Sequence, residues 1–167
     1  MNNRKYSVFI DNLGSCIDRY CPAYGRKFTI EEKFDRAKSV ELLSAVDIVL
    51  TPEFIGEKQR IRENLARTGL KAASIAIDTF ADPVFQKGSF SSPDPKVRAL
   101  AIERGKDAID FAASIGCSVV TTWPGQDGYD YLFAADYIKE RTLFQEAMAE
   151  LCDYNPDMTI TMEYKIK

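Results

Sequence analysis

The sequence contains no histidine and only one tryptophan, and its four cysteines have no regular spacing. Without histidine and without a Cys-x-x-Cys pair, neither the usual zinc sites nor a Cys–His nucleophile pair can be assembled. We therefore expect Cys16, Cys21, Cys117 and Cys152 to be reduced structural thiols.

The chain also lacks a surplus of positive charge. It has 22 Lys and Arg residues against 25 Asp and Glu residues, which gives a net charge of -3 at pH 7. Binding to nucleic acid or to an anionic membrane normally needs an extended positive field, so we expect neither partner. The first residues have no apolar signal core, and no apolar run approaches the roughly 20 residues that span a bilayer. The expectation is a cytoplasmic protein.

Short apolar runs alternate along the chain with segments of helical periodicity. Strands are expected at residues 6–11, 45–50, 70–77, 117–123 and 158–164. Helices are expected to begin at residue 29 and to cover residues 57–67, 94–116 and 134–152. A strict alternation of strand and helix predicts a parallel sheet with right-handed crossovers.

Local signals support these boundaries. Thr29 and Glu32 have the spacing of a capping box, in which each residue satisfies a free N–H of the first helical turn. Gly69 is expected to end the second helix in a left-handed conformation. The apolar positions assigned to one face of the first helix are Phe34, Ala37, Val40 and Leu42.

Two architectures fit this alternation, a doubly wound open sheet and a TIM barrel. No Gly-x-Gly-x-x-Gly follows the first strand, which argues against a dinucleotide-binding open sheet. Long loops follow strands one, three and four, as at the active face of a barrel. A full barrel needs about 250 residues and eight strands. The α/β fold is therefore predicted to be an incomplete (β/α)8 TIM barrel of four units plus a fifth strand, with residues 1–167 as the amino-terminal part of one domain.

Three segments contain the polar and aromatic residues typical of a binding site. They are residues 80–92 after the third strand, residues 122–129 after the fourth, and residues 163–165 at the end of the fifth. Residues two apart on a strand face the same side, so Glu163 and Lys165 are both expected to point inward. A buried carboxylate beside a buried ammonium group is costly unless each has partners. A metal ion and substrate oxygens would be such partners.

These three segments resemble the xylose isomerase and rhamnose isomerase superfamily. Residues 80–92 look like its Phe-rich sugar-binding loop, and residues 122–129 are similar to its Trp-Gly-Gly-Arg-Glu-Gly stretch. Residues 163–165 match its Glu-x-Lys motif. The resemblance implies a metal-dependent isomerase that interconverts an aldose and a ketose, or a related sugar epimerase.

The resemblance also implies roles for single residues. Glu163 would bind Mg2+, Mn2+ or Co2+, and Lys165 would stabilise the charge that develops on the reacting oxygen. Three aromatic residues would shield the sugar from water and stack on its C–H groups: Trp123, Phe80 and Phe85. Asp78 and Asp127 would bind sugar hydroxyls.

The chain departs from the superfamily pattern at one catalytic position. Xylose isomerases carry a catalytic histidine on the second strand, and rhamnose isomerases carry one after the third. Here the second strand ends in Leu-Thr-Pro-Glu53, and the sequence has no histidine. Glu53 is the candidate acid or base, or substrate contact, at this position. The remaining metal ligands are expected beyond Lys167.

Other functions remain open at this point. The chain could be a non-catalytic half-barrel that oligomerises through its open strand edges. Independently of this alternative, Trp123 could be a core residue, and Glu163 and Lys165 could form a structural ion pair. Sugar-phosphate isomerases, inosose dehydratases and metal-dependent endonucleases share the barrel, but the missing histidines and basic face argue against an endonuclease. The expected partners are a small-molecule sugar and either further copies of the chain or a missing carboxyl-terminal half.

Overall fold

The computed structural model describes residues 4–14, 26–52, 54–124 and 131–163. Its strands are β1 (Tyr6–Phe9), β2 (Leu43–Val49), β3 (Lys71–Ile77), β4 (Val119–Thr122) and β5 (Thr159–Met162). Its α-helices are α1 (Ile30–Ser39), α2 (Lys58–Thr68), α3 (Pro95–Ser114) and α4 (Tyr137–Tyr154). Three short 3-10 helices are η1 (Ile10–Leu13), η2 (Pro83–Phe85) and η3 (Leu132–Ala134).

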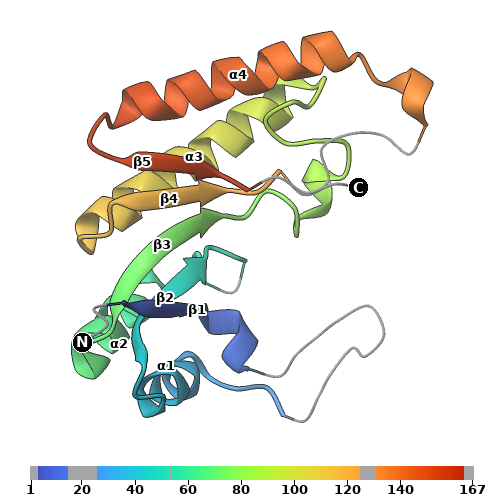
Figure 1. The fold of residues 1–167 in the computed structure, drawn as a ribbon. Coiled ribbons are helices and arrows are strands. Elements are labelled where there is room, and N and C mark those ends of the chain that lie inside the picture. The colour runs from blue at the N-terminus through green and yellow to red at the C-terminus, as the bar shows by residue number, and fades with distance from the viewer. Residues whose placement is uncertain (1–3, 15–25, 53, 125–130, 164–167) are drawn as a thin grey trace.

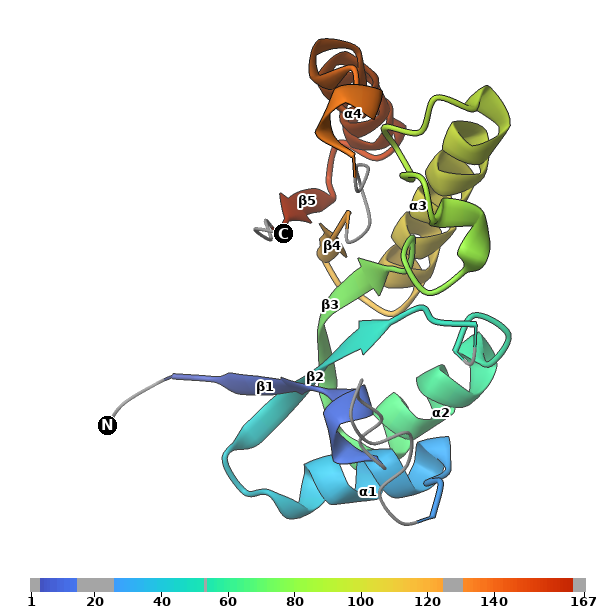
Figure 2. The ribbon, with the colours of Figure 1, turned by 90° about the vertical axis from the view of Figure 1, so that its right-hand side faces the viewer.

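The strands form one parallel sheet in the order β1-β2-β3-β4-β5, so strands that follow each other in the chain also lie side by side (Figure 1). The sheet is curved, and the helices lie on its outer side (Figure 2). This arrangement is part of a barrel wall with its helical ring. The predicted α/β fold and the incomplete barrel are confirmed.

The helix-facing side of the sheet carries the apolar core. Ile48, Ile75, Val120 and Ile160 are partners across four consecutive strands. The first three are fully buried, and Ile160 packs against the same core cluster. Such continuous apolar rows are typical of parallel strands that are covered by helices. The core therefore lies between the sheet and the helices. The opposite, inner face of the sheet does not belong to this core.

The inner face of the sheet is lined by small and polar side chains. The hydroxyl of Ser74 donates a hydrogen bond of 2.7 Å to Asp47 Oδ1, between β3 and β2. The hydroxyls of Thr121 and Thr161 lie 2.9 Å apart, between β4 and β5. Because residues alternate between faces along each strand, these four side chains lie opposite the apolar rows. Polar side chains on the inner face are compatible with a binding site for a polar ligand at the carboxyl end of these strands.

The first helix begins as predicted and ends sooner. Thr29 and Glu32 form the capping box, with the Glu32 N–H donating to Thr29 Oγ1 and the Thr29 N–H donating to Glu32 Oε2. Because the helix ends at Ser39, its apolar face stops there. The prediction that Val40 and Leu42 belong to that face is wrong, since they are 44 % and 74 % exposed in the turn before β2.

Other local predictions are confirmed with small shifts in the boundaries. Gly69 ends α2 with a φ of 70°, in the left-handed region that favours glycine. The first strand is shorter than predicted, because residues 10–13 turn into η1. The fourth helix begins at Tyr137, three residues later than predicted, where the Asp136 carboxylate accepts the Lys139 N–H.

Two further predictions concern the cysteines and the membrane. Cys117 and Cys152 are free thiols, as expected, while Cys16 and Cys21 lie outside the described residues. Burial raises the pKa of the Cys117 thiol, which keeps this thiol protonated and unreactive. In the described part of the chain, every helix is too short or too polar to cross a bilayer.

Candidate active site

The candidate site lies where β3, β4 and β5 end. Ile77, Thr122 and Met162 are partners across these strands. The residues that follow them are Asp78, Trp123 and Glu163, in the same order. Since residues alternate between faces, these three positions continue the inner face of the sheet. The register thus brings three predicted site residues together at the carboxyl edge, where barrel enzymes bind their substrates.

Glu163 continues the pairing of β5 beyond the end of the strand. Its N–H donates a hydrogen bond of 2.9 Å to the carbonyl oxygen of Thr122. This bond fixes the backbone of Glu163 next to Trp123, while the Glu163 side chain is exposed. The carboxylate is therefore accessible at the edge of the sheet.

Asp78 is buried, with an exposed fraction of 1 %. Its Oδ1 accepts the N–H groups of Phe80 and Ala81 at 3.1 and 2.9 Å, which folds the chain into a tight turn. Its Oδ2 is also buried and has no hydrogen-bond partner among the described residues. A buried carboxylate oxygen without a donor is costly, so this oxygen is a strong candidate to accept a hydrogen bond from a ligand.

Two threonine hydroxyls share this property. Thr79 and Thr122 are fully buried, and neither Oγ1 has a partner among the residues that the structure describes. Sequence reasoning did not single out either residue, because a threonine near a strand end usually reflects β-propensity. Their burial without hydrogen-bond partners among the described residues is a property of the tertiary structure, and it shows that polar groups concentrate at this edge.

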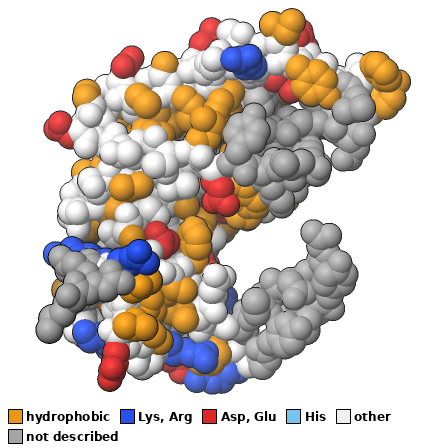
Figure 3. All heavy atoms as spheres, viewed as in Figure 1, with side chains coloured by type: hydrophobic (Ala, Val, Ile, Leu, Met, Phe, Trp, Pro, Cys, Tyr) orange, Lys and Arg blue, Asp and Glu red, His pale blue; other side chains and the backbone are white. Residues whose placement is uncertain are grey.

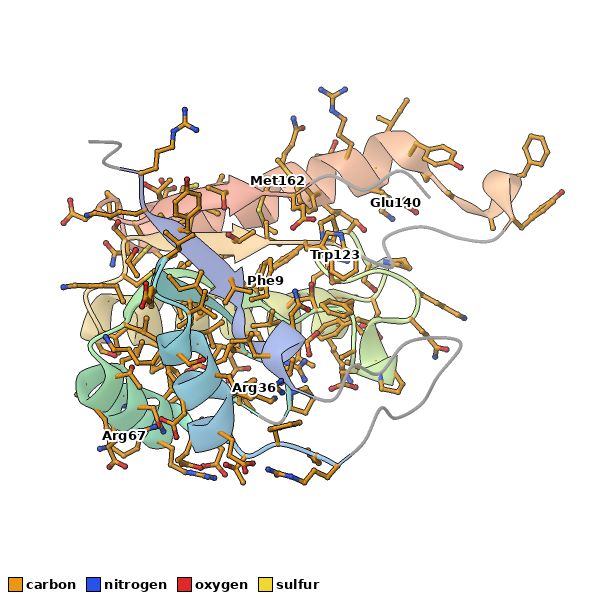
Figure 4. The ribbon with its side chains drawn as sticks, turned by 60° about the horizontal axis from the view of Figure 1, so that its bottom comes forward. Phe9, Arg36, Arg67, Trp123, Glu140 and Met162 are labelled. Atoms are coloured by element: carbon orange, nitrogen blue, oxygen red, sulfur yellow. The ribbon has the colours of Figure 1, made fainter. Side chains whose placement is uncertain are left out.

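Aromatic residues cover one side of the site. The rings of Phe80 and Trp123 meet edge to face, with centroids 4.4 Å apart and an angle of 69° between their planes. Figure 4 shows Trp123 just beyond the end of β4. Phe85 is fully buried in the core beneath the loop. Phe80 and Trp123 therefore form the apolar surface at this edge, and Phe85 supports the loop from below.

Three predicted site residues, Glu53, Asp127 and Lys165, lie outside the described residues. Their predicted roles as acid or base, hydroxyl ligand and oxygen-stabilising amine stay predictions. The same holds for the expectation that Lys165 shares the inner face with Glu163.

The described residues fit a metal ion only in part. Glu163 offers carboxylate oxygens, the ligands that Mg2+ and Mn2+ prefer. However, the described part of the chain contains no group of three or more His, Cys, Asp or Glu residues that could hold a metal ion. Since such cations take about six ligands, the described residues do not form a complete metal site.

An arginine outside the predicted set contacts the loop after β3. Arg104, on α3, forms a salt bridge of 2.7 Å with Asp82. Asp82 also accepts the N–H of Val84, and these two hydrogen bonds hold the pKa of the Asp82 carboxyl below its usual range, with the backbone bond as the larger cause. Arg104 lies 26 residues from Asp78 in the chain, so no local sequence signal connects it to the site.

Comparison with protein families gives a match to the family described as xylose isomerase-like TIM barrel, over residues 37–164. That range includes the whole of β2 to β5 and the three residues at the carboxyl edge.

Several curated proteins named xylose isomerase are similar to this chain in sequence. The chain is 34 % identical over 98 residues to the xylose isomerase of Thermus thermophilus, which covers 55 % of this chain and 25 % of that protein. It is 35 % identical over 86 residues to the xylose isomerase of Paraburkholderia phytofirmans, covering 49 % of this chain and 20 % of that protein. The chain thus spans about a quarter of the length of these relatives.

Solved structures confirm the fold. An AP endonuclease family 2 protein from Brucella melitensis superposes with a TM-score of 0.67 at 12 % identity, covering 95 % of this chain and 54 % of that one. A D-tagatose 3-epimerase-like protein gives a TM-score of 0.64 at 19 % identity, covering 83 % of this chain and 50 % of that one. At these identities the similarity concerns the fold alone.

Proposed function

The chain belongs to the xylose isomerase-like TIM barrel family, and from this membership we propose that it is part of an enzyme that isomerises or epimerises a sugar. The observation that carries the proposal is the cluster of Asp78, Trp123 and Glu163 at the carboxyl edge, with a buried carboxylate oxygen that has no donor among the described residues. Sequence relatives named xylose isomerase support the sugar as substrate class.

In this proposal, residues 1–167 form the amino-terminal part of one barrel domain. Phe80 and Trp123 exclude water from one side of the sugar and stack on its C–H groups. Asp78 Oδ2 accepts a hydrogen bond from a sugar hydroxyl, which gives this buried oxygen the partner that it lacks among the described residues. Phe85 does not contact the sugar in this proposal; its buried ring anchors the loop after β3 in the core.

Aldose and ketose have the same composition, so their interconversion needs no oxidant. One hydrogen moves from the second carbon to the first, and one proton moves from the hydroxyl on the second carbon to the oxygen on the first. Lys165 donates a hydrogen bond to the oxygen on which negative charge develops, and Glu53 serves as acid or base in place of the family's histidine.

A divalent cation, Mg2+, Mn2+ or Co2+, would polarise the carbonyl and the neighbouring hydroxyl of the sugar when bound. Glu163 would be one of its ligands, and Asp127 would bind a sugar hydroxyl. The other metal ligands would come from residues outside those that the structure describes.

The proposal is tested with the full-length protein that contains this sequence. A panel of aldoses and ketoses is incubated with the enzyme and Mn2+, and the products are separated by chromatography. We expect Glu163→Gln to lower kcat/KM by about a hundredfold or more, because it removes a carboxylate ligand of the cation that would polarise the sugar.

Glu41→Gln is the matched control, since Glu41 is exposed in the turn between α1 and β2, before the strand begins. It should leave the activity unchanged. Full activity of Glu163→Gln, or the absence of turnover on every sugar of the panel with Mn2+, would contradict the proposal.

The second candidate function is a non-catalytic half-barrel that associates with another copy. It is favoured by the outer strands, because β1 and β5 each pair with only one neighbour in the described sheet. A stable dimer that ignores metal and turns over no sugar would support this alternative.

A further inference from the structure

The loop after β3 begins with a five-residue turn, residues 78–82, that carries two of the proposed substrate contacts. Asp78 supplies a carboxylate oxygen, Oδ2, that has no partner in the described part of the chain, and Phe80 supplies the ring that meets Trp123. The position of both groups depends on how this turn is held against the rest of the molecule.

Arg104 reaches from α3 to both ends of the turn. Its Nη1 donates a hydrogen bond of 3.2 Å to the carbonyl oxygen of Asp78. Its Nη2 donates one of 2.7 Å to Asp82 Oδ2. One planar guanidinium thus connects the first and the last residue of the turn, and Phe80 lies between them.

A third contact fixes the plane of the guanidinium. The central carbon of the Arg104 guanidinium lies 4.8 Å from the centroid of the buried Phe85 ring. The side chain of Arg104 is 21 % exposed and that of Asp82 is 33 % exposed. Because this ion pair is partly shielded from water, solvent weakens it less than an ordinary surface pair.

The turn also has hydrogen bonds between residues of the loop itself, and these bonds do not connect the turn to α3. Asp78 Oδ1 accepts from Phe80 and Ala81, and Asp82 Oδ1 accepts from Val84. These bonds determine the shape of the turn. The contacts of Arg104 determine the position of the turn relative to α3, and therefore the position of the Phe80 ring relative to Trp123.

We propose that Arg104 is a positioning residue, which holds the turn of residues 78–82 so that the Phe80 ring contacts Trp123 and Asp78 Oδ2 faces the substrate. Arg104 itself does not contact the substrate. The part of this inference that concerns a sugar rests on the proposed function, whereas the part that concerns the turn does not.

Lysine cannot replace Arg104 in this role. An ammonium group carries one compact charge, whereas the guanidinium offers two separate N–H groups to two acceptors and a flat face to a ring. We therefore expect Arg104→Lys to keep the positive charge but to lose the simultaneous hydrogen bonds to Asp78 and Asp82 and the contact with the Phe85 ring. Arg104→Gln should lose both the charge and these contacts.

The first test uses Trp123, the single tryptophan of the sequence, as a reporter of the turn. Tryptophan fluorescence and acrylamide quenching are measured on the full-length protein without substrate; where that protein has further tryptophans, they are replaced by phenylalanine. We expect stronger quenching and emission at longer wavelength in Arg104→Gln, and a smaller change in the same direction in Arg104→Lys. Circular dichroism checks that the helices are retained.

Asp82→Asn removes the ion pair and keeps the turn. The asparagine oxygen can still accept the Val84 N–H, so the cap of η2 remains while the charge disappears. This variant should also increase quenching of Trp123. If Arg104→Gln does not fold, the quenching of Trp123 in Asp82→Asn tests the positioning role of Arg104 instead.

Arg62 provides the matched control. Its guanidinium also lies over a phenylalanine ring, that of Phe111 at 5.2 Å, and it donates to Ser114 Oγ. Arg62→Gln removes an equivalent arginine that touches neither the turn nor Trp123. Its fluorescence and quenching should match those of the parent protein.

The second test measures kinetics in the active enzyme. A displaced turn should raise KM by about tenfold in Arg104→Lys, with a smaller effect on kcat, because the substrate contacts are misplaced while the reacting groups are intact. Unchanged fluorescence and quenching in Arg104→Gln and Asp82→Asn would overturn the positioning role. A protein without sugar turnover but with altered quenching would instead contradict the proposed function alone.

Discussion

Single residues at the carboxyl edge differ in whether their polar atoms have partners. Thr122 and Thr121 are neighbours on β4 and face opposite sides of the sheet. The hydroxyl of Thr121 is paired with that of Thr161 at 2.9 Å, whereas the hydroxyl of Thr122 is buried without a partner among the described residues. The hydroxyl of Thr121 therefore stabilises the fold, whereas the hydroxyl of Thr122 destabilises it.

This contrast predicts opposite effects of two equivalent substitutions. Thr122→Val removes an unpaired buried hydroxyl and should raise the free energy of unfolding by about 1 kcal/mol. Thr121→Val removes a hydrogen bond and should lower it by about 1 kcal/mol. Urea denaturation of both variants without ligand measures the difference, and equal effects of the two substitutions would contradict the assignment.

At the scale of elements, α1 and α2 are connected by ion pairs across their contact. Glu31 on α1 accepts hydrogen bonds of 3.0 and 2.8 Å from the guanidinium of Arg60 on α2. These bonds are the largest cause that lowers the pKa of Glu31 from 4.5 to about 2. Both side chains are more than 40 % exposed, so solvent screens the pair and limits its contribution to stability.

The lowered pKa predicts how this pair depends on pH. A carboxyl whose pKa is lower in the folded state stabilises the fold above its unfolded pKa, and this contribution is lost as the pH falls. For Glu31 the loss should occur between pH 4.5 and about 2. The parent protein should therefore exceed Glu31→Gln in free energy of unfolding at neutral pH, and the difference should shrink over that range.

Glu63→Gln is a suitable comparison for this experiment. Glu63 accepts a hydrogen bond from the neutral amide of Gln59 rather than from an arginine. Chemical denaturation at a series of pH values measures all three proteins. A difference between the parent and Glu31→Gln that stays constant down to pH about 2 would show that the Arg60 pair does not set the Glu31 pKa.

At the scale of the whole molecule, the described sheet has two outer strands. The exposed apolar side chains of the described residues include Met162 on β5, at 51 %, and Tyr6 on β1, at 46 %. Further ones lie in or next to η3 and in the first turn of α4: Tyr131, Phe133, Tyr137 and Ile138. Figure 3 shows apolar side chains in this region, at the upper right of the molecule. Unpaired strand edges with apolar residues favour association.

We therefore expect a protein consisting of residues 1–167 to self-associate. Met162→Lys should weaken this association, because a charge on an outer strand disfavours edge pairing. Leu42→Lys is the control, since Leu42 is 74 % exposed in the turn before β2 and lies on neither outer strand. Sedimentation velocity over a range of concentrations measures the effect, and a parent that stays monomeric throughout would contradict the expectation.

The sequence by itself determined the alternation of elements and several of their ends. The Thr29 capping box, the glycine at residue 69 and the apolar run of β3 depend on interactions within a few residues, so local patterns suffice to predict them. The same alternation of side chains predicts that Glu163, which follows β5, lies on the inner face, and this orientation stays a prediction.

Only the tertiary structure decided which residues meet. The register of β3, β4 and β5 places Trp123 between Asp78 and Glu163 along the edge of the sheet, and the packing of α3 brings Arg104 to the turn after β3. Burial of Asp78 and the exposure of Leu42 are likewise consequences of packing. These properties depend on contacts between residues far apart in the chain, and no local periodicity contains that information.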